Sequence, residues 1–150
     1  MKIIPVVCAI IEQDYLVLCA LRSEHMSLPG KLEFPGGKLE LNELPEEALI
    51  REIKEELNIE IKIIKALPIA EYAYVPGKII QLIPYRNAIV SDETPSATEH
   101  AELRWVKRDE LLQLDWADKT FLIESFNKTD GPGFISRYFH VRTYLSNPKK

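Results

Sequence analysis

Residues 36–59 read GGKLELNELPEEALIREIKEELNI, and this stretch decides the fold of the chain. Gly36 and Gly37 predict a tight bend, because glycine accepts backbone conformations that other residues avoid. Pro45 then predicts the first turn of a helix, where the N–H that proline lacks would have had no intrahelical partner. The pattern carries this helix to about Leu57. The stretch therefore predicts one glycine-rich loop followed by one helix.

Three glutamates share one side of this helix. An α-helix advances about 100° per residue, so Glu52, Glu55 and Glu56 fall within an arc of about 100°. Like charges at these separations each destabilise a helix by about 0.2–0.5 kcal/mol unless a cation lies over them. The arrangement therefore indicates a site for a hard divalent metal ion.

The spacing resembles the Nudix box, the sequence signature of the Nudix hydrolases. That signature runs Gly, five residues, Glu, seven residues, Arg-Glu, aliphatic, any residue, Glu-Glu, any residue, Gly, aliphatic. Eight of the nine specified positions match, namely Gly37, Glu43, Arg51, Glu52, Ile53, Glu55, Glu56 and Ile59. The one departure is Asn58 in place of glycine, at a helix end that favours a left-handed residue, for which asparagine is the usual second choice.

Composition limits the number of domains, the kinds of partner and the cellular compartment that the chain suits. At 150 residues, with 46% hydrophobic and 28% charged residues, the chain (1–150) suits a single domain. A net charge of −4 argues against duplex nucleic-acid binding, and an acidic protein that handles polyphosphates needs a metal to mediate the contact. Cys8 and Cys19 lack Cys-x-x-Cys spacing, which favours buried free thiols in a reducing cytoplasm. No apolar run approaches the roughly 18 residues of a membrane span, and no signal peptide is expected.

Strand and helix patterns are interspersed along the chain. Extended runs are expected at 3–11, 15–21, 59–75 with a break at Pro68, 78–90 and 103–106, and helices at 45–57, 108–113 and 118–126. The 45–57 helix is expected to pack on the sheet through Ile50, Ile53 and Leu57. The expected fold is α+β, an α/β/α sandwich with a central mixed sheet between helices. Residues 127–150 form an extension without an assigned role, in which 134–145 could pair as a strand across a homodimer interface.

Within the Nudix superfamily the chain is most similar to the MutT-type nucleoside triphosphate pyrophosphohydrolases, over about residues 4–126. The run LEFPGGK at residues 32–38 is close to the sequence that introduces the box in that branch. The resemblance implies the Nudix fold and a reaction in which water attacks an internal phosphorus of a nucleoside triphosphate. The products would be a nucleoside monophosphate and pyrophosphate, and oxidised or noncanonical nucleotides are one class of expected substrate.

The resemblance also implies a ligand set for Mg²⁺, with Mn²⁺ as a substitute. Glu99, six residues before Trp105, matches a glutamate that adds a metal ligand from a loop. Mg²⁺ prefers carboxylate, carbonyl and water oxygens. The expected donors are the carboxylates of Glu52, Glu55, Glu56 and Glu99 and the carbonyl of Gly36.

Four side chains are expected to act as general base or as supports of the site. Glu52 is the first choice for the general base and Glu99 is the second, and the sequence does not separate them. Arg51 is expected to hold the carboxylates in place through paired hydrogen bonds that lysine could not reproduce. Glu43 is expected to support the loop.

Nucleotide contacts are expected from four residues. Arg22 and Lys78 could meet phosphate, Phe34 could stack on the base, and Asp118 could accept hydrogen bonds from a base edge. Simpler roles stay open for three of them: core packing for Phe34, a solvent-exposed turn for Lys78 and a helix N-cap for Asp118. The three histidines form no ligand pattern and are expected to be structural or on the surface: His25, His100 and His140.

Two alternative functions remain. One is a Nudix enzyme for another nucleoside diphosphate derivative, such as a dinucleoside polyphosphate or an ADP-sugar. The other, from a different class, is a Nudix-like domain that senses a nucleotide without cleaving it. The intact box glutamates argue against the second.

Overall fold

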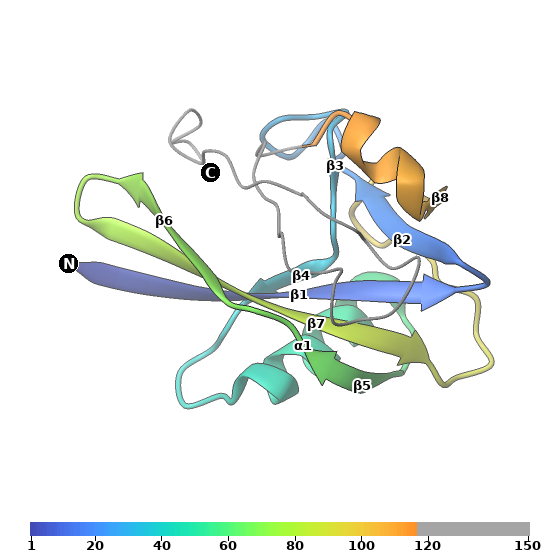
Figure 1. Ribbon diagram of the computed structural model, residues 1–150, viewed down its shortest axis with the longest axis horizontal. Helices are drawn as coiled ribbons and strands as arrows, with labels where there is room; N and C mark the ends of the chain where they lie inside the picture. The colour runs from blue at the N-terminus through green and yellow to red at the C-terminus, as the bar shows by residue number, and fades with distance from the viewer. Residues whose placement is uncertain (117–150) are drawn as a thin grey trace.

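The computed structural model describes residues 1–116, apart from the side chains of Tyr72, Tyr74 and Leu112. In this part of the chain, strands form one mixed sheet accompanied by an α-helix and a 3-10 helix (Figure 1). In chain order the elements are β1 (Lys2–Gln13), β2 (Leu16–Leu21), β3 (Leu32–Glu33), β4 (Gly36–Lys38), α1 (Pro45–Leu57), β5 (Ile61–Ala66), β6 (Ala70–Val75), β7 (Lys78–Ile89), β8 (Glu102–Lys107) and η1 (Arg108–Gln113).

The two longest strands, β1 and β7, form the centre of the sheet. They run parallel, in register from Lys2 opposite Lys78 to Ile11 opposite Asn87. The other pairings are antiparallel, and the strand order is β3-β2-β1-β7-β5, with β4 on β1, β6 on β7 and β8 on β2. The predicted α+β class with a mixed sheet is confirmed.

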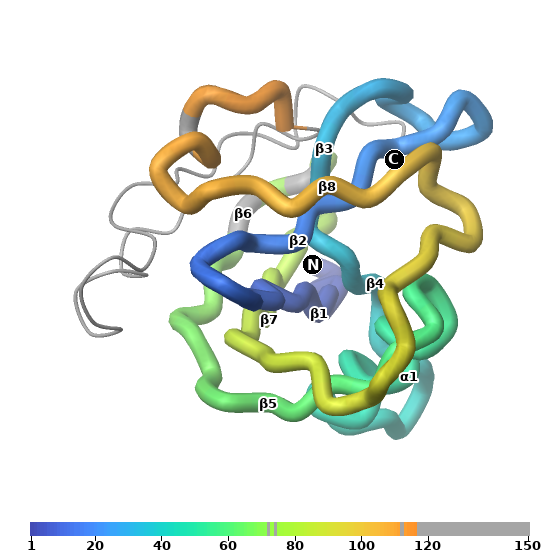
Figure 2. Tube along the Cα trace, turned by 90° about the vertical axis from the view of Figure 1, so that its right-hand side faces the viewer, coloured from blue at the N-terminus to red at the C-terminus, as the bar shows by residue number. Residues whose placement is uncertain are grey.

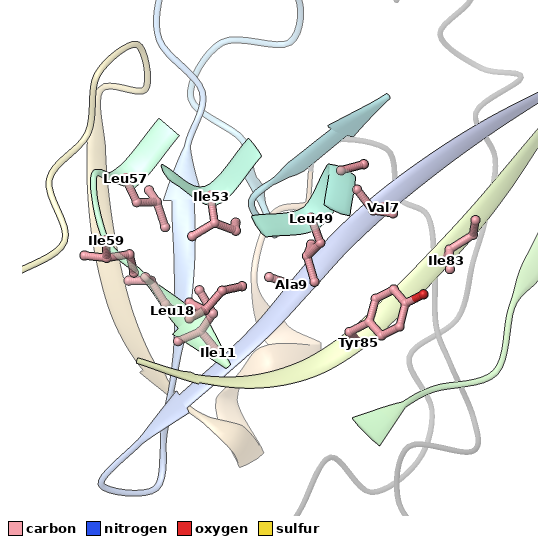
Figure 3. Packing of buried hydrophobic residues seen from close by; sticks show 12 residues of the cluster. Val7, Ala9, Ile11, Leu18, Leu49, Ile53, Leu57, Ile59, Ile83 and Tyr85 are labelled. Atoms are coloured by element: carbon pink, nitrogen blue, oxygen red, sulfur yellow. The ribbon is translucent and has the colours of Figure 1, made fainter. Parts of the chain in front are cut away.

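Side chains of β1 alternate between two apolar layers, because successive residues of a strand point to opposite faces. Val7, Ala9 and Ile11 pack under α1 with Leu49 and Ile53, as Figure 3 shows. The opposite face carries a second cluster that includes Cys8, Ile10 and Leu111 of η1. The sheet therefore lies between α1 and η1 (Figure 1).

Helix α1 has the bounds that the sequence predicts, Pro45–Leu57. It ends at Asn58, which takes the left-handed conformation (φ 57°, ψ 41°) expected of a glycine substitute. The prediction that Ile50 packs on the sheet is wrong, because its side chain is 42% exposed. Leu49 and Ile53 make that contact instead, and Ile50 lies about 100° further around the helix from Leu49.

The remaining predictions on the fold divide into two groups. The helix predicted at 108–113 is present as the 3-10 helix η1, and Cys8 and Cys19 are buried free thiols as expected. The predicted helix at 118–126 and the extension at 127–150 lie outside the described residues. Among residues 1–116, no helix is long and apolar enough to cross a membrane.

Candidate active site

Two glycines let β4 approach the rest of the site. The segment predicted as a bend is a short strand, in which Gly36 lies opposite Cys8 and Gly37 opposite Val7. A Cβ atom on Gly36 would lie 2.0 Å from the Val7 carbonyl oxygen, and one on Gly37 would lie 2.4 Å from the carboxylate of Glu52. At Gly36 glycine is therefore required by the backbone of β1, whereas a Cβ atom at position 37 would displace the side chain of Glu52.

Arg51 holds the box together as expected. Its Nε and Nη2 donate to the two carboxylate oxygens of Glu43 at 2.7 and 2.8 Å, and Nη2 also donates to the Lys38 carbonyl at 3.2 Å. Its Nη1 lies 3.2 Å from an oxygen of Glu52 and 3.3 Å from one of Glu55. The hydrogen bonds from Arg51 lower the pKa of Glu43 to about 2. One guanidinium thus joins the loop before α1 to two of the predicted metal ligands.

Glu56 carries the most perturbed carboxyl group of the box. Burial raises its pKa to about 8, and the negative charges of Glu52, Glu33 and Glu99 add to the effect. A hydrogen bond of 3.3 Å from the Gly36 N–H opposes the shift only in part. Burial also raises the pKa of Glu52, although Arg51 partly compensates. Three other carboxyl groups, from α1, β3 and the loop before β8, therefore lie within electrostatic reach of Glu56.

The loop between β7 and β8 caps the carboxyl end of α1. The last carbonyls of a helix have no partner within it. Here the Ser96 N–H donates to the Leu57 carbonyl at 3.0 Å and the Thr98 N–H donates to the Glu56 carbonyl at 3.2 Å. The Thr98 hydroxyl lies 3.2 Å from the Glu55 carbonyl and 3.1 Å from that of Glu56. Figure 2 shows this loop, in yellow, passing beside α1.

This capping brings the fifth predicted ligand to the box. Glu99 follows Thr98 directly and is exposed to solvent. The three segments that carry the predicted ligands, β4, α1 and this loop, are thus in contact with one another. Only the resemblance to the MutT-type enzymes indicated that a loop about 40 residues beyond the box reaches it, because residue spacing does not specify such a long-range contact.

A partly buried network of charged side chains lies beside this cluster, and the sequence did not reveal it. One carboxylate oxygen of Glu33 accepts a hydrogen bond from Arg22 Nη1, and the other lies beside His100 Nε2, each at 2.7 Å. Burial opposes ionisation of Glu33, but His100 and Arg22 outweigh it and lower the pKa of Glu33. His100 is buried, in line with the structural role expected of it. The only hint in the sequence was the place of Glu33 in the LEFPGGK run.

The predicted nucleotide contacts are less well assembled. Arg22 donates to Glu33 and also to the backbone carbonyl and hydroxyl of Ser27, so three of its five N–H groups are engaged within the protein. Phe34 is only 7% exposed and its ring centroid lies 4.9 Å from that of Trp116, which favours the core role left open above. Lys78 pairs with Lys2, six residues along β1 from the partner of Gly36, a separation of about 20 Å. Asp118 lies outside the described residues.

The donor chemistry of the site suits a hard divalent ion. Among residues 1–116, no three His, Cys, Asp or Glu side chains already gather closely enough to coordinate one ion. The segments that carry the oxygen donors nevertheless lie against one another, and the pKa of Glu56 is raised mainly by burial and further by the charges of Glu52, Glu33 and Glu99. A cation is the partner that would favour the ionised form of all of them.

Comparison with known proteins gives a consistent result. The family model described as NUDIX domain matches residues 1–124. CTP pyrophosphohydrolase of Escherichia coli K12 is 39% identical over 129 residues, covering 84% of this chain and 93% of that protein. 8-oxo-dGTP diphosphatase of Haemophilus influenzae is 34% identical over 112 residues, covering 73% and 80%. The solution structure of MutT, a Nudix hydrolase from methicillin-resistant Staphylococcus aureus 252, superposes with a TM-score of 0.63 at 43% identity, covering 78% of this chain and 89% of that one.

Proposed function

Since the chain belongs to the Nudix family and is a MutT-type pyrophosphohydrolase, we propose that it hydrolyses nucleoside triphosphates to nucleoside monophosphate and pyrophosphate in a Mg²⁺-dependent reaction. The observation that carries the proposal is the Glu56 cluster. A partly buried carboxyl group with a pKa of about 8, within electrostatic reach of three further carboxylates, is a poor structural element and a good cation site.

The proposed ligands are the Gly36 carbonyl and the carboxylates of Glu52, Glu55, Glu56 and Glu99. Mg²⁺ bound there would neutralise phosphate charge and make a coordinated water more acidic. Mn²⁺ takes the same oxygen donors and is the expected substitute. Arg51 would keep Glu52 and Glu55 in place through the contacts of Nη1 described above.

Glu52 is the proposed general base, with Glu99 as the second candidate. The side chain of Glu52 is 16% exposed, so it is partly shielded from water, and its raised pKa brings it closer to neutral pH. A general base is most effective when its pKa lies near the working pH. Glu99 is exposed and would accept a proton from the loop side of the site.

The proposed substrates follow from the names of two relatives and from the chemistry of Asp118. The names of the relatives specify CTP and 8-oxo-dGTP, and an aspartate such as Asp118 suits a base edge that presents N–H donors. We therefore expect CTP and 8-oxo-dGTP to be among the better substrates. The enzyme is proposed to act in the cytoplasm, in keeping with its two free buried cysteines.

A nucleotide panel tests this proposal. CTP, 8-oxo-dGTP, the common ribo- and deoxynucleoside triphosphates, ADP-ribose and a diadenosine polyphosphate would each be incubated with Mg²⁺, and kcat/KM measured from product formation. We expect the highest kcat/KM among the triphosphates. Cleavage confined to ADP-ribose or to the dinucleotide would contradict the triphosphate proposal, and no turnover on any compound would support a non-catalytic domain.

Asp118→Ala tests the base contact separately. If Asp118 reads the base, the substitution changes the ratio of kcat/KM values between CTP and other triphosphates far more than it lowers the common rate. An unchanged ratio would show that Asp118 acts only as a helix cap.

A further inference from the structure

Glu99 lies between two residues that are each fixed to a different part of the site. On one side, Thr98 is bonded through its N–H and its hydroxyl to carbonyls of Glu55 and Glu56. On the other side, His100 is 8% exposed and its Nε2 lies 2.7 Å from a carboxylate oxygen of Glu33. The backbone around Glu99 is therefore held at both ends.

Both supports are themselves bonded within the fold. The carbonyls of Glu55 and Glu56 belong to the same helix that presents the carboxylates of those residues, so Thr98 is tied directly to the ligand-bearing element. Glu33 is held on its second oxygen by Arg22. Since the single hydroxyl proton of Thr98 can serve either carbonyl, the contact tolerates small movements of the helix end.

Glu99 itself is exposed to solvent, and none of the hydrogen bonds described above involves its side chain. A flexible exposed carboxylate loses rotamer freedom when it is recruited to a ligand, and a fixed backbone reduces that cost. Its charge is nevertheless felt at Glu56, which places Glu99 within electrostatic reach of the box.

We propose that Thr98 and His100 are positioning residues that hold the Glu99 carboxylate beside the carboxylates of α1. Neither residue touches the reacting atoms; each acts through Glu99. The inference rests on the proposed function in so far as Glu99 is taken to be a metal ligand.

The test uses Mn²⁺ binding to the full-length protein without nucleotide, followed by electron paramagnetic resonance of the free ion. Thr98→Val removes the hydroxyl and keeps the shape, whereas Thr98→Ser keeps the hydroxyl. Thr94→Val is the matched control, because Thr94 is an exposed threonine of the same loop. We expect Thr98→Val to weaken Mn²⁺ binding about threefold to tenfold, Thr98→Ser to bind close to wild type, and Thr94→Val to have no effect.

Combination with Glu99→Gln distinguishes positioning from a general effect on stability. If Thr98 acts through Glu99, Thr98→Val causes no further loss of Mn²⁺ affinity once Glu99→Gln is present. Equal losses in both backgrounds would overturn the proposal, as would a loss in Thr94→Val of the same size or a wild-type protein that binds no Mn²⁺.

His100 is tested by the pair His100→Gln and His100→Leu. The amide of glutamine can still donate to Glu33, whereas leucine cannot, so we expect Mn²⁺ affinity in the order wild type, His100→Gln, His100→Leu. Equal affinity in all three folded proteins would remove His100 from the proposal, and if His100→Leu does not fold, the Thr98 series decides. Because no nucleotide is present, a protein that shows the expected coupling but hydrolyses no triphosphate refutes the proposed function alone.

Discussion

Alanine substitution is predicted to lower the catalytic rate at Gly37 and the stability of the fold at Gly36. A Cβ atom at position 37 would meet the carboxylate of Glu52 at 2.4 Å, whereas one at position 36 would meet the Val7 carbonyl oxygen at 2.0 Å and the Cys8 Cα at 2.7 Å. The first clash is with the end of a flexible side chain, and the second is with the backbone of β1. Gly37→Ala should therefore displace the carboxylate proposed as the general base, and Gly36→Ala should disrupt the sheet.

The expected magnitudes follow from these distances. An ordinary contact of about 3.4 Å or more requires the Glu52 carboxylate to move by about 1 Å, and a misplacement of that size can lower a catalytic rate about 100-fold. Because the side chain can turn aside, Gly37→Ala should lower the free energy of unfolding by less than about 1 kcal/mol. Gly36→Ala should lower it by about 1–3 kcal/mol or more, since the backbone of β1 and β4 must separate.

The assay measures kcat on CTP and, in parallel, urea unfolding of both variants. We expect Gly37→Ala to unfold at nearly the wild-type urea concentration with a much reduced kcat, and Gly36→Ala to unfold at a lower concentration. A fully active Gly37→Ala enzyme would refute the assignment of a positioned catalytic carboxylate to Glu52. Wild-type stability in Gly36→Ala would show that β4 does not approach β1 as described.

Three further predictions concern the helix that carries the box. Glu56 has a pKa of about 8 in the fold and an ordinary value of 4.5 when unfolded, so without metal the free energy of unfolding should fall by a few kcal/mol as the pH rises from about 4.5 to about 8, at about 1.4 kcal/mol per pKa unit. Thermal melts should show this pH dependence in the wild-type protein and a weaker one with Mg²⁺. Glu56→Gln should lose the Glu56 contribution and also its activity, and a wild-type pH dependence in that variant would contradict the reasoning. Arg51→Lys should lower kcat about 10-fold or more, because lysine cannot bond Glu43 and Glu52 together, and unchanged kinetics would show that the clamp is dispensable. Leu44→Ser should stabilise the protein by about 0.5–1 kcal/mol in urea unfolding. Leu44, the N-cap residue of α1, makes no side-chain hydrogen bond, whereas Glu47 already accepts a hydrogen bond from the Leu44 N–H, so a serine hydroxyl would complete the capping box. A destabilised variant would show that the exposed leucine contributes packing instead.

Sequence reasoning succeeded where the relevant physics is local. The bounds of α1 follow from Pro45 at one end and Asn58 at the other, and both signals act within one helical turn. The position of Ile50 was predicted wrongly because Ile50 and Leu49 are both apolar, and only the orientation of the helix on the sheet decides which of them is buried.

The contacts within residues 37–59 of the site could be predicted from the sequence, whereas the contacts between segments far apart in the chain could not. The Arg51 contacts with Glu43 and Glu52 join residues whose spacing is fixed by the loop and helix they share. By contrast, Glu33 meets His100 across 67 positions of sequence, and Thr98 meets the carbonyl of Glu55 across 43. Such contacts depend on strand order, which a single sequence does not specify. Phe34 shows the same limit, since the same aromatic residue suits a base or a core until its neighbours are known.

Phosphorus NMR of the products from CTP tests the central claim most directly. The protein would be incubated with CTP and Mg²⁺, with a Glu56→Gln sample and a sample containing excess chelator as controls. We predict CMP and pyrophosphate in equal amounts from the wild-type sample only. Release of CDP and inorganic phosphate, or equal turnover in the chelated sample, would contradict the assignment of the box to metal-dependent cleavage at an internal phosphorus.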